Sequence, residues 1–186
     1  DPASVSALVA STLQIEGRAA DAAVGARLGD RALSASPSGA SWQVSIPMPA
    51  SATALRLHAG THERLLVLEP DPDSVPVVTL ALPARDTIYR RPTGVVRLVA
   101  DAADDLGLAS GGFEIVVSSG NGENFAFRQG TTGAVSISGR SRTLVSALSL
   151  DSLNLQPGDI LQLRAVARDR NDVSGPGVGT SETRTL

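Results

Sequence analysis

The residues of this chain whose types could do chemistry are oxygen-bearing side chains gathered in three short segments. They are Asp71 and Asp73, then Asp101, Asp104 and Asp105, and finally Asp169, Asn171 and Asp172. Calcium takes six to eight hard oxygen ligands of this kind. No single segment supplies six oxygens in workable geometry, so a calcium site requires a fold that brings the segments together.

Two other roles for these side chains remain open. Arg64, Arg168 and Arg170 lie close enough in sequence to pair with the carboxylates, and exposed pairs of this kind contribute little. Asp and Asn also favour loops because their side chains accept hydrogen bonds from nearby backbone N–H groups. The calcium hypothesis therefore competes with ion pairing and with loop capping.

Motifs for catalysis are weak. His58 and His62 with Glu63 could hold zinc, but Gly60 between alternating flanks predicts a hairpin with two surface histidines. The chain has no Gly-x-Ser-x-Gly element that would support a serine nucleophile. The Gly-rich stretches 130–133 and 175–179 do not lie between a strand and a helix, as a phosphate site would require. We predict a non-enzyme with no catalytic residue and no cofactor other than the calcium considered above.

Composition excludes several classes of partner. The net charge is −3, and the sixteen Arg residues are spread along a chain that has no Lys, so no basic stripe for nucleic acid is present. No apolar run approaches the 18 or so residues of a spanning helix, so we expect no membrane insertion. The absence of Cys removes disulfides and thiolate metal sites. Apolar residues make up 42% of the chain and aromatic residues 3%, which predicts a core of Val, Leu, Ile and Ala.

A Pro-rich segment divides the chain. Residues 69–76 contain three prolines and three carboxylates, a composition that disfavours both a helix and a central strand. We interpret residues 71–76 as a semi-rigid linker. It separates a small β-sandwich domain, residues 1–70, from an immunoglobulin-like β-sandwich domain, residues 77–186.

Short alternating stretches bounded by turn residues predict an all-β fold. We expect strands near residues 13–16, 24–28, 42–46, 55–58 and 65–68, and then near 77–82, 95–99, 113–117, 124–127, 143–150, 160–167 and 179–186. Residues 3–13 also favour a strand over a helix. Asn121-Gly122 predicts a type I′ hairpin turn. Seven strands in roughly 110 residues match the size of an immunoglobulin-like sandwich.

The aromatic residues are too few to line a surface. Trp42 is predicted to fill the core of the first domain, with a partner-binding role as the alternative. Phe113, Phe125 and Phe127 are interpreted as core or cross-strand packing residues.

The region from Leu155 to Asp159 is predicted to form a corner. The strand that follows it has alternating apolar residues. Gly158 is expected to adopt a positive φ, and Leu155 and Leu163 are expected to be buried. This corner, the following LQLRAVARD and the Gly-rich loop resemble the E–F corner and the F and G strands of fibronectin type III and related Ig-like modules. Leu161 or Leu163 stands where those modules have a tyrosine.

A second resemblance covers roughly residues 70–186. Asp104-Asp105-Leu106-Gly107-Leu108, together with the Pro-Gly-Asp corner and Ala-Arg-Asp-Arg-Asn-Asp, looks like a family of uncharacterised bacterial membrane-anchored proteins. In that family Ig-like extracytoplasmic modules lie between N-terminal membrane helices and a helical C-terminal region. The resemblance implies two tandem Ig-like or fibronectin type III-like sandwiches in the periplasm or at the cell surface.

The Ig-like topology also predicts where the acidic segments lie. In an Ig-like sandwich the three acidic segments would meet at one pole, and residues 168–172 resemble the calcium-binding strings of cadherin-like arrays. We predict a non-catalytic structural or protein-interaction module, with other domains of the same chain or envelope proteins as partners. A carbohydrate- or peptidoglycan-binding module and an accessory domain of an enzyme remain alternatives.

Overall fold

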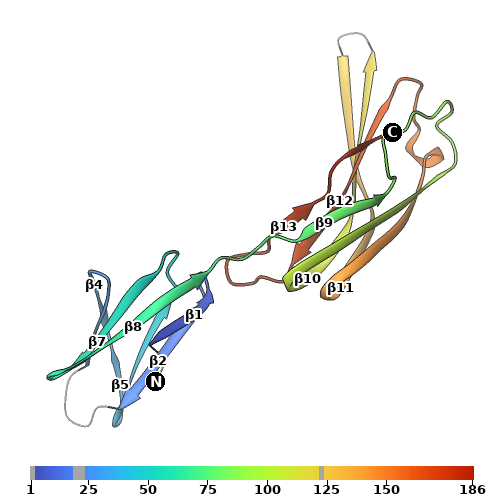
Figure 1. Ribbon diagram of the computed structural model, residues 1–186. Coiled ribbons are helices and arrows are strands. Elements are labelled where there is room, and N and C mark those ends of the chain that lie inside the picture. The colour runs from blue at the N-terminus through green and yellow to red at the C-terminus, as the bar shows by residue number, and fades with distance from the viewer. Residues whose placement is uncertain (1–2, 19–23, 122–123) are drawn as a thin grey trace. The chain divides into compact units, whose positions relative to one another are not determined.

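The regular secondary structure of the described residues is almost entirely β-strand. The computed structural model describes residues 3–18, 24–121 and 124–186. The chain forms two compact units, residues 1–73 and 74–186, and the division falls inside the segment predicted as a linker. Figure 1 shows strands throughout both units, apart from one short 3-10 helix.

Among the described residues, the first unit contains two sheets and eight strands. Its eight strands are β1 (Ser4–Leu8), β2 (Thr12–Arg18), β3 (Val24–Leu28), β4 (Arg31–Ser34), β5 (Ser36–Ser38), β6 (Ser41–Pro47), β7 (Thr53–Ala59) and β8 (His62–Asp71). Five strands form a sheet in the order β1-β8-β7-β3-β4, and three form a sheet in the order β2-β6-β5. Since β1 pairs with β8 in parallel, the N-terminal strand lies beside the last strand of the unit.

Small aliphatic side chains form the core of the first unit, as the composition predicts. The buried cluster is Ala26, Val44, Ile46, Met48, Leu55, Leu57, Leu66 and Leu68. Trp42 is half-buried and packs against this cluster, on the opposite strand from Gly17. A Cβ atom at position 17 would lie within 2.5 Å of the indole ring, so glycine leaves the space that the ring fills.

Two details of the first unit differ from the sequence prediction. Residues 3–13 are not one strand, because Ala10 has a φ of 68° and turns the chain between β1 and β2. Residues 71–76 were interpreted as a linker, yet β8 continues through Pro70 to Asp71. Proline is tolerated there because the pairing of β8 with β7 ends at Leu68, and β8 beyond it pairs on one side only, with β1.

The second unit is built on two long strands. Its elements are β9 (Val77–Leu82), β10 (Val95–Asn121), β11 (Asn124–Ser149), the 3-10 helix η1 (Asp151–Leu153), β12 (Ile160–Asp169), β13 (Val178–Thr180) and β14 (Arg184–Thr185). The sheet order is β11-β10-β12-β13, with β14 also paired to β12 and β9 paired to β10. Antiparallel pairing joins β10 to β11 along nearly their whole length.

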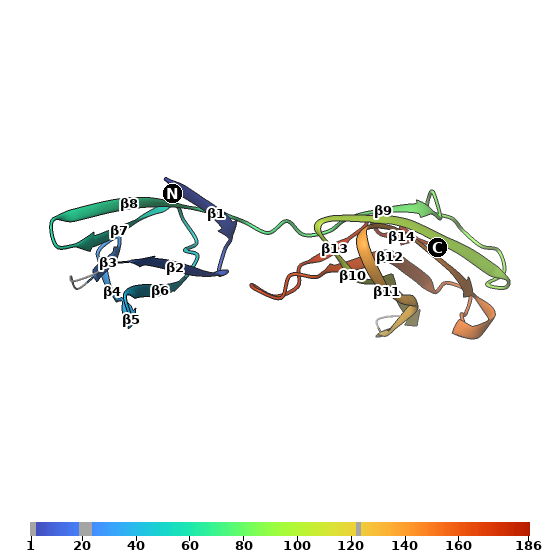
Figure 2. The ribbon, with the colours of Figure 1, turned by 90° about the horizontal axis from the view of Figure 1, so that it is seen from below.

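The sheet of the second unit folds over at a bend in β10. The register shifts between Ala103 and Leu108, where Gly107 has a φ of 109°. Before the bend β10 pairs with β9, and after it β10 pairs with β12 (Figure 2). Residues from both halves of β10, including Leu98 and Ile115, share one buried cluster with β11 and β12. The arrangement is sandwich-like, with the core between the two halves of the sheet.

The bulges in β10 and β11 explain where the predicted strand boundaries fail. Residues 95–99 and 113–117 were expected as separate strands, but both belong to β10, and residues 124–127 and 143–150 fall within or next to β11. A β-bulge lets one strand change direction without leaving its ladder. Asn121, expected at a central position of the turn, is instead the last residue of β10 and pairs with Asn124, whereas Gly122 of the predicted turn lies outside the described residues.

The corner before β12 follows the prediction closely. Gly158 has a φ of 96°, a conformation that disfavours residues with a Cβ atom. Leu163 is buried, and Leu155 is half-buried against the core. The N–H of Asp159 donates to the Gln156 carbonyl at 3.0 Å, and the N–H of Gln156 donates to the Asp159 carboxylate at 3.0 Å.

This corner predicts a pH dependence of stability. The pKa of Asp159 is lowered from 3.8, chiefly because the Gln156 N–H donates to its carboxylate, and Arg128 adds a favourable charge. A carboxyl whose folded pKa is depressed stabilises the fold above its unfolded pKa and loses that contribution as pH falls through the folded pKa. We expect Asp159→Asn to destabilise by about 1 kcal/mol at pH 7 and by less below pH 3.8. Urea unfolding at several pH values measures this, and a difference that is constant with pH would contradict it.

Candidate functional site

The metal-ligand candidates of the first unit are placed as follows. Asp71 ends β8, where its carboxylate accepts a hydrogen bond from the Ser6 hydroxyl at 2.6 Å. Asp73 is half-buried at the end of the unit. His58 and His62 lie on the β7–β8 hairpin, as predicted, and Gly60 has a φ of 58° in its turn. Their positions are those of strand residues beside a hairpin turn.

Three of the candidate acids in the second unit are exposed. Asp101 was expected in a loop but lies within β10, because the ladder with β9 and β11 continues past it. Its carboxylate accepts a hydrogen bond from the Thr143 hydroxyl at 2.7 Å. Asp105 lies at the bend of β10, and Asp172 lies in the loop after β12.

Asp169 is buried and organises the loop after β12. Its side chain is 1% exposed. One carboxylate oxygen accepts hydrogen bonds from the N–H groups of Asn171 at 2.9 Å and Gly177 at 3.0 Å, and the other accepts from Gly177 at 2.9 Å. The Asn171 side chain in turn accepts from Val173 and Ser174. Both side chains hold the backbone of the loop, which is the capping role considered above.

Asp104 is the carboxylate at the bend of β10 whose pKa is shifted. It is 9% exposed, and its Oδ2 accepts hydrogen bonds from the N–H groups of Leu106 at 2.9 Å and Gly107 at 2.6 Å. Its Oδ1 is buried without a hydrogen-bond partner. Burial raises the pKa of Asp104 above 3.8, and the negative charges of Asp169 and Asp105 add to the rise against the two hydrogen bonds. Asp104 therefore stabilises the bend while carrying an electrostatic penalty.

The expected pairing of Arg170 with a carboxylate is replaced by contacts with the backbone. Its guanidinium donates to the carbonyls of Leu108 at 3.0 Å and Ile137 at 2.9 Å, which ties the loop after β12 to β10 and β11. Among the described residues, no group of three or more His, Asp or Glu side chains is arranged to hold a metal ion. Calcium binding stays a prediction from the sequence.

A melting experiment tests calcium directly. A ligand that binds only the folded state raises the melting temperature by mass action. Since the Asp169 and Asp104 carboxylates already accept backbone hydrogen bonds, we expect the same melting temperature in millimolar calcium and in chelator. A rise that calcium causes and that Asp105→Asn or Asp172→Asn abolishes would establish the site.

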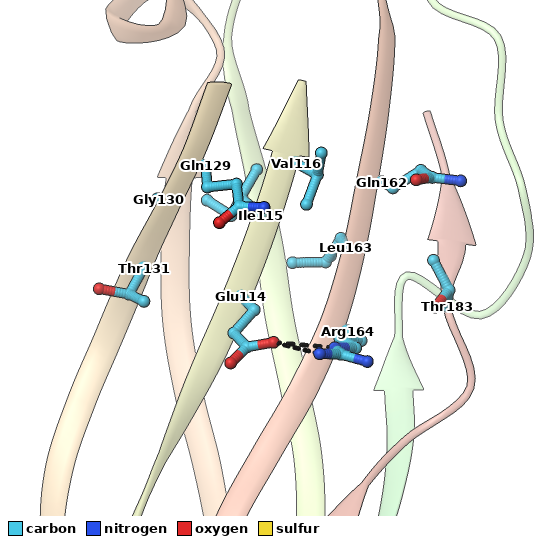
Figure 3. A pocket seen from close by; sticks show the side chains of 10 residues that line it. All are labelled: Glu114, Ile115, Val116, Gln129, Gly130, Thr131, Gln162, Leu163, Arg164 and Thr183. Carbon is cyan, nitrogen blue, oxygen red and sulfur yellow. Dashed lines mark hydrogen bonds and ion pairs between the residues drawn. The ribbon is translucent and has the colours of Figure 1, made fainter. Parts of the chain in front are cut away.

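A different surface of the second unit has the features of a binding site. The outer face of β10, β11 and β12 contains a hollow of about 620 Å³ (Figure 3). Its lining residues are Glu114, Ile115, Val116, Gln129, Gly130, Thr131, Gln162, Leu163, Arg164 and Thr183. We call this surface the β10–β12 face. No sequence prediction concerned this surface. The alternation of polar and apolar residues in β10 and β12 could have indicated it, because it places polar side chains on the outer face.

Cross-strand pairing determines the chemistry of the β10–β12 face. Glu114 lies opposite Arg164, and their side chains form an ion pair at 2.7 Å, drawn as dashed lines in Figure 3. Val116 lies between Gln129 on β11 and Gln162 on β12. The face therefore offers amide donors and acceptors around an apolar strip, with no nucleophile and base in contact. Such a surface suits binding.

Two exposed phenylalanines extend this face. Phe125 and Phe127 are 68% and 67% exposed, so neither is a core residue, whereas Phe113 is buried as predicted. Phe127 lies level with Ile160, the first residue of β12, and Phe125 lies two residues further toward the end of the β10–β11 hairpin. Ser118 lies opposite both Phe127 and Ile160, and Ile160 is also exposed. Exposed aromatic side chains beside polar ones are typical of interaction surfaces.

Fold and surface together define an all-β protein of sandwich-like units, one of which presents an exposed, partly aromatic sheet face. The described part of the chain has no helix with the length and hydropathy needed to cross a bilayer. Neither a scan against models of protein families nor a search of curated proteins finds a match for the chain.

Proposed function

We propose that this chain is a non-catalytic module of the extracytoplasmic part of a bacterial membrane-anchored envelope protein, and that its β10–β12 face binds another protein domain. The single observation that carries the interaction role is the exposed sheet face, with Phe125 and Phe127 beside the hydrogen-bonding groups of the hollow. The cellular location rests on the resemblance of residues 104–108, the Pro-Gly-Asp corner and residues 167–172 to that family.

The proposal includes an Ig-like or fibronectin type III-like topology for the units. For the second unit the support is the distribution of its strand segments. If each long strand is counted as two segments, β9 and residues 95–103 and 141–149 form one layer, and residues 108–121 and 124–139, β12, and β13 with β14 form the other. Seven segments in two layers correspond to the immunoglobulin-like arrangement.

A carbohydrate- or peptidoglycan-binding role is the second candidate. Gln129 and Gln162 lie in the hollow as amide side chains suited to hydroxyl groups, and Phe125 and Phe127 offer apolar rings on the same sheet face. Protein binding is favoured because the face also carries the Glu114–Arg164 ion pair and the exposed aliphatic Ile160, which suit a protein surface better than a sugar.

Photo-crosslinking in the full-length protein in intact cells tests this function. A photoreactive amino acid at Gln162 is expected to form crosslinks to protein, because this position lies in the hollow. The same amino acid at Thr79, an exposed position on β9, is the matched control and should give none. Crosslinks of equal yield at both positions would contradict the proposal. Sedimentation of the chain with peptidoglycan that Gln162→Ala abolishes would assign the face to carbohydrate instead.

A further inference from the structure

The outer edge of β11 is open for backbone pairing. In the described structure β11 is the edge of its sheet, with β10 as its only ladder partner. Of residues 125–136, all are exposed except Thr132, which is half-buried. Successive strand residues direct their N–H and C=O groups to alternate sides. Between Phe125 and Thr132, where the ladder with β10 is regular, every second residue therefore presents an unpaired donor and acceptor to the open edge.

This edge lacks the devices that usually prevent strand pairing. Exposed edges are normally short or carry charges and prolines. Residues 125–138 contain no proline and one charged residue, Arg128. Its guanidinium is directed back to the unit, donating to the Leu153 carbonyl at 2.8 Å and lying 3.7 Å from the Asp159 carboxylate. By contrast, β13 and β14 have three and two residues.

The two exposed rings lie on this edge strand. Phe125 and Phe127 are two residues apart and share a face of the sheet. A Cβ atom at Gly120 would lie 3.0 Å from the Phe125 ring, so this ring lies over its cross-strand neighbour. Large apolar side chains beside unpaired backbone groups favour the addition of another strand, which would cover both.

We propose that a second copy of this chain pairs with β11 edge to edge, antiparallel, about a two-fold axis at Phe127. The inference goes beyond the proposed function of the β10–β12 face, because it concerns the open edge of β11. In this register Phe125 lies opposite Gln129 of the second copy, and Ala126 lies opposite its Arg128. A two-fold interface uses the same patch on both copies, so the patch must be self-complementary.

Charge selects the second copy and this register. The segment carries one charged residue, Arg128. Two copies can therefore pair without charge repulsion as long as their Arg128 side chains do not face each other. An axis at Arg128 would place like charges directly opposite, which is unfavourable in a strand pair. An axis at Phe127 places each Arg128 opposite a small, uncharged residue. The contact is smaller than a standard interface, so we expect a dissociation constant on the order of 10⁻⁴ M.

Sedimentation velocity of the chain between about 10 µM and 1 mM tests the proposal. The fraction of the wild-type chain that is dimeric is expected to increase with concentration, whereas Phe127→Ser is expected to remain monomeric. Val145→Ser is the matched control, because Val145 is 60% exposed on the same strand but outside the proposed segment. It should behave like the wild type, and circular dichroism should show the same strand content for all variants.

Opposite charges at one position test the register. Ala126→Glu places a carboxylate opposite Arg128 of the other copy and should lower the dissociation constant about three- to tenfold. Ala126→Lys places like charges there and should raise it by a similar factor. Equal effects of the two substitutions would overturn the register and with it the proposal.

Two further results would overturn the proposal. They are a wild-type chain that stays monomeric at 1 mM, and a monomer that binds anionic vesicles through Phe127. If the chain stays monomeric while the photoreactive group at Gln162 captures a different protein, the dimer fails and the interaction function stands. If neither occurs, both fail.

Discussion

Leu163→Ala is expected to lower the free energy of unfolding of the second unit by about 2–5 kcal/mol. Leu163 is 1% exposed on β12 and belongs to the cluster between the two halves of the folded sheet. Removing most of its side chain leaves a cavity in a core made largely of small aliphatic residues, which have little freedom to fill it. Urea unfolding monitored by circular dichroism measures the loss.

The neighbouring Gln162→Ala provides the control for Leu163. Gln162 is exposed on the outer face of the same strand, so its truncation should change stability by no more than about 0.5 kcal/mol. Equal losses for the two substitutions would mean that β12 does not direct its odd-numbered residues into the core.

Asp169→Ala is expected to destabilise the second unit by about 2–4 kcal/mol in the absence of any metal. The substitution removes the acceptor of the N–H groups of Asn171 and Gly177, and Asn171 is 4% exposed, so its N–H would stay buried without that partner. The released loop also carries Arg170, which contacts β10 and β11. Thermal melting in chelator measures the effect.

Asp172→Ala distinguishes this structural role from metal binding. Asp172 is an exposed acid in the same loop, so its removal should change stability by no more than about 0.5 kcal/mol. If Asp169→Ala changed the melting temperature only when calcium was present, the carboxylate would act as a ligand and the loop-capping account would fail.

Local sequence patterns predicted the features that depend on near neighbours in the chain. Alternation along β12 placed Leu161, Leu163, Ala165 and Ala167 on one face, and all four are buried. Gly158 was predicted to adopt a positive φ because its neighbours Pro157 and Asp159 favour a turn, and it does. The predicted strand at residues 77–82 coincides with β9. These features are set by backbone geometry within a few residues.

Tertiary structure decided the candidate site. The sequence placed Phe125 and Phe127 on one face of their strand, but it did not specify whether that face is turned to the core. Cross-strand pairing places the rings opposite Gly120 and Ser118, on the other face of β10 from the buried Ile115 and Val117, so the rings are exposed. Glu114 and Arg164 are fifty residues apart and meet only through the register between β10 and β12. No local pattern specifies that register.

The acidic segments also separate what the sequence determined from what the tertiary structure decided. Composition alone established that Asp104 and Asp169 lie in oxygen-rich segments, and it left calcium binding, ion pairing and loop capping open. The bend of β10 and the course of the loop after β12 gave both carboxylates backbone N–H partners. Thus the sequence by itself determined the all-β class, the strand faces and the turns, since these follow from side-chain period and backbone preference. The joining of strands through bulges, the exposed β10–β12 face and the partners of the buried acids were decided only by the tertiary structure, because each depends on contacts between residues far apart in the chain.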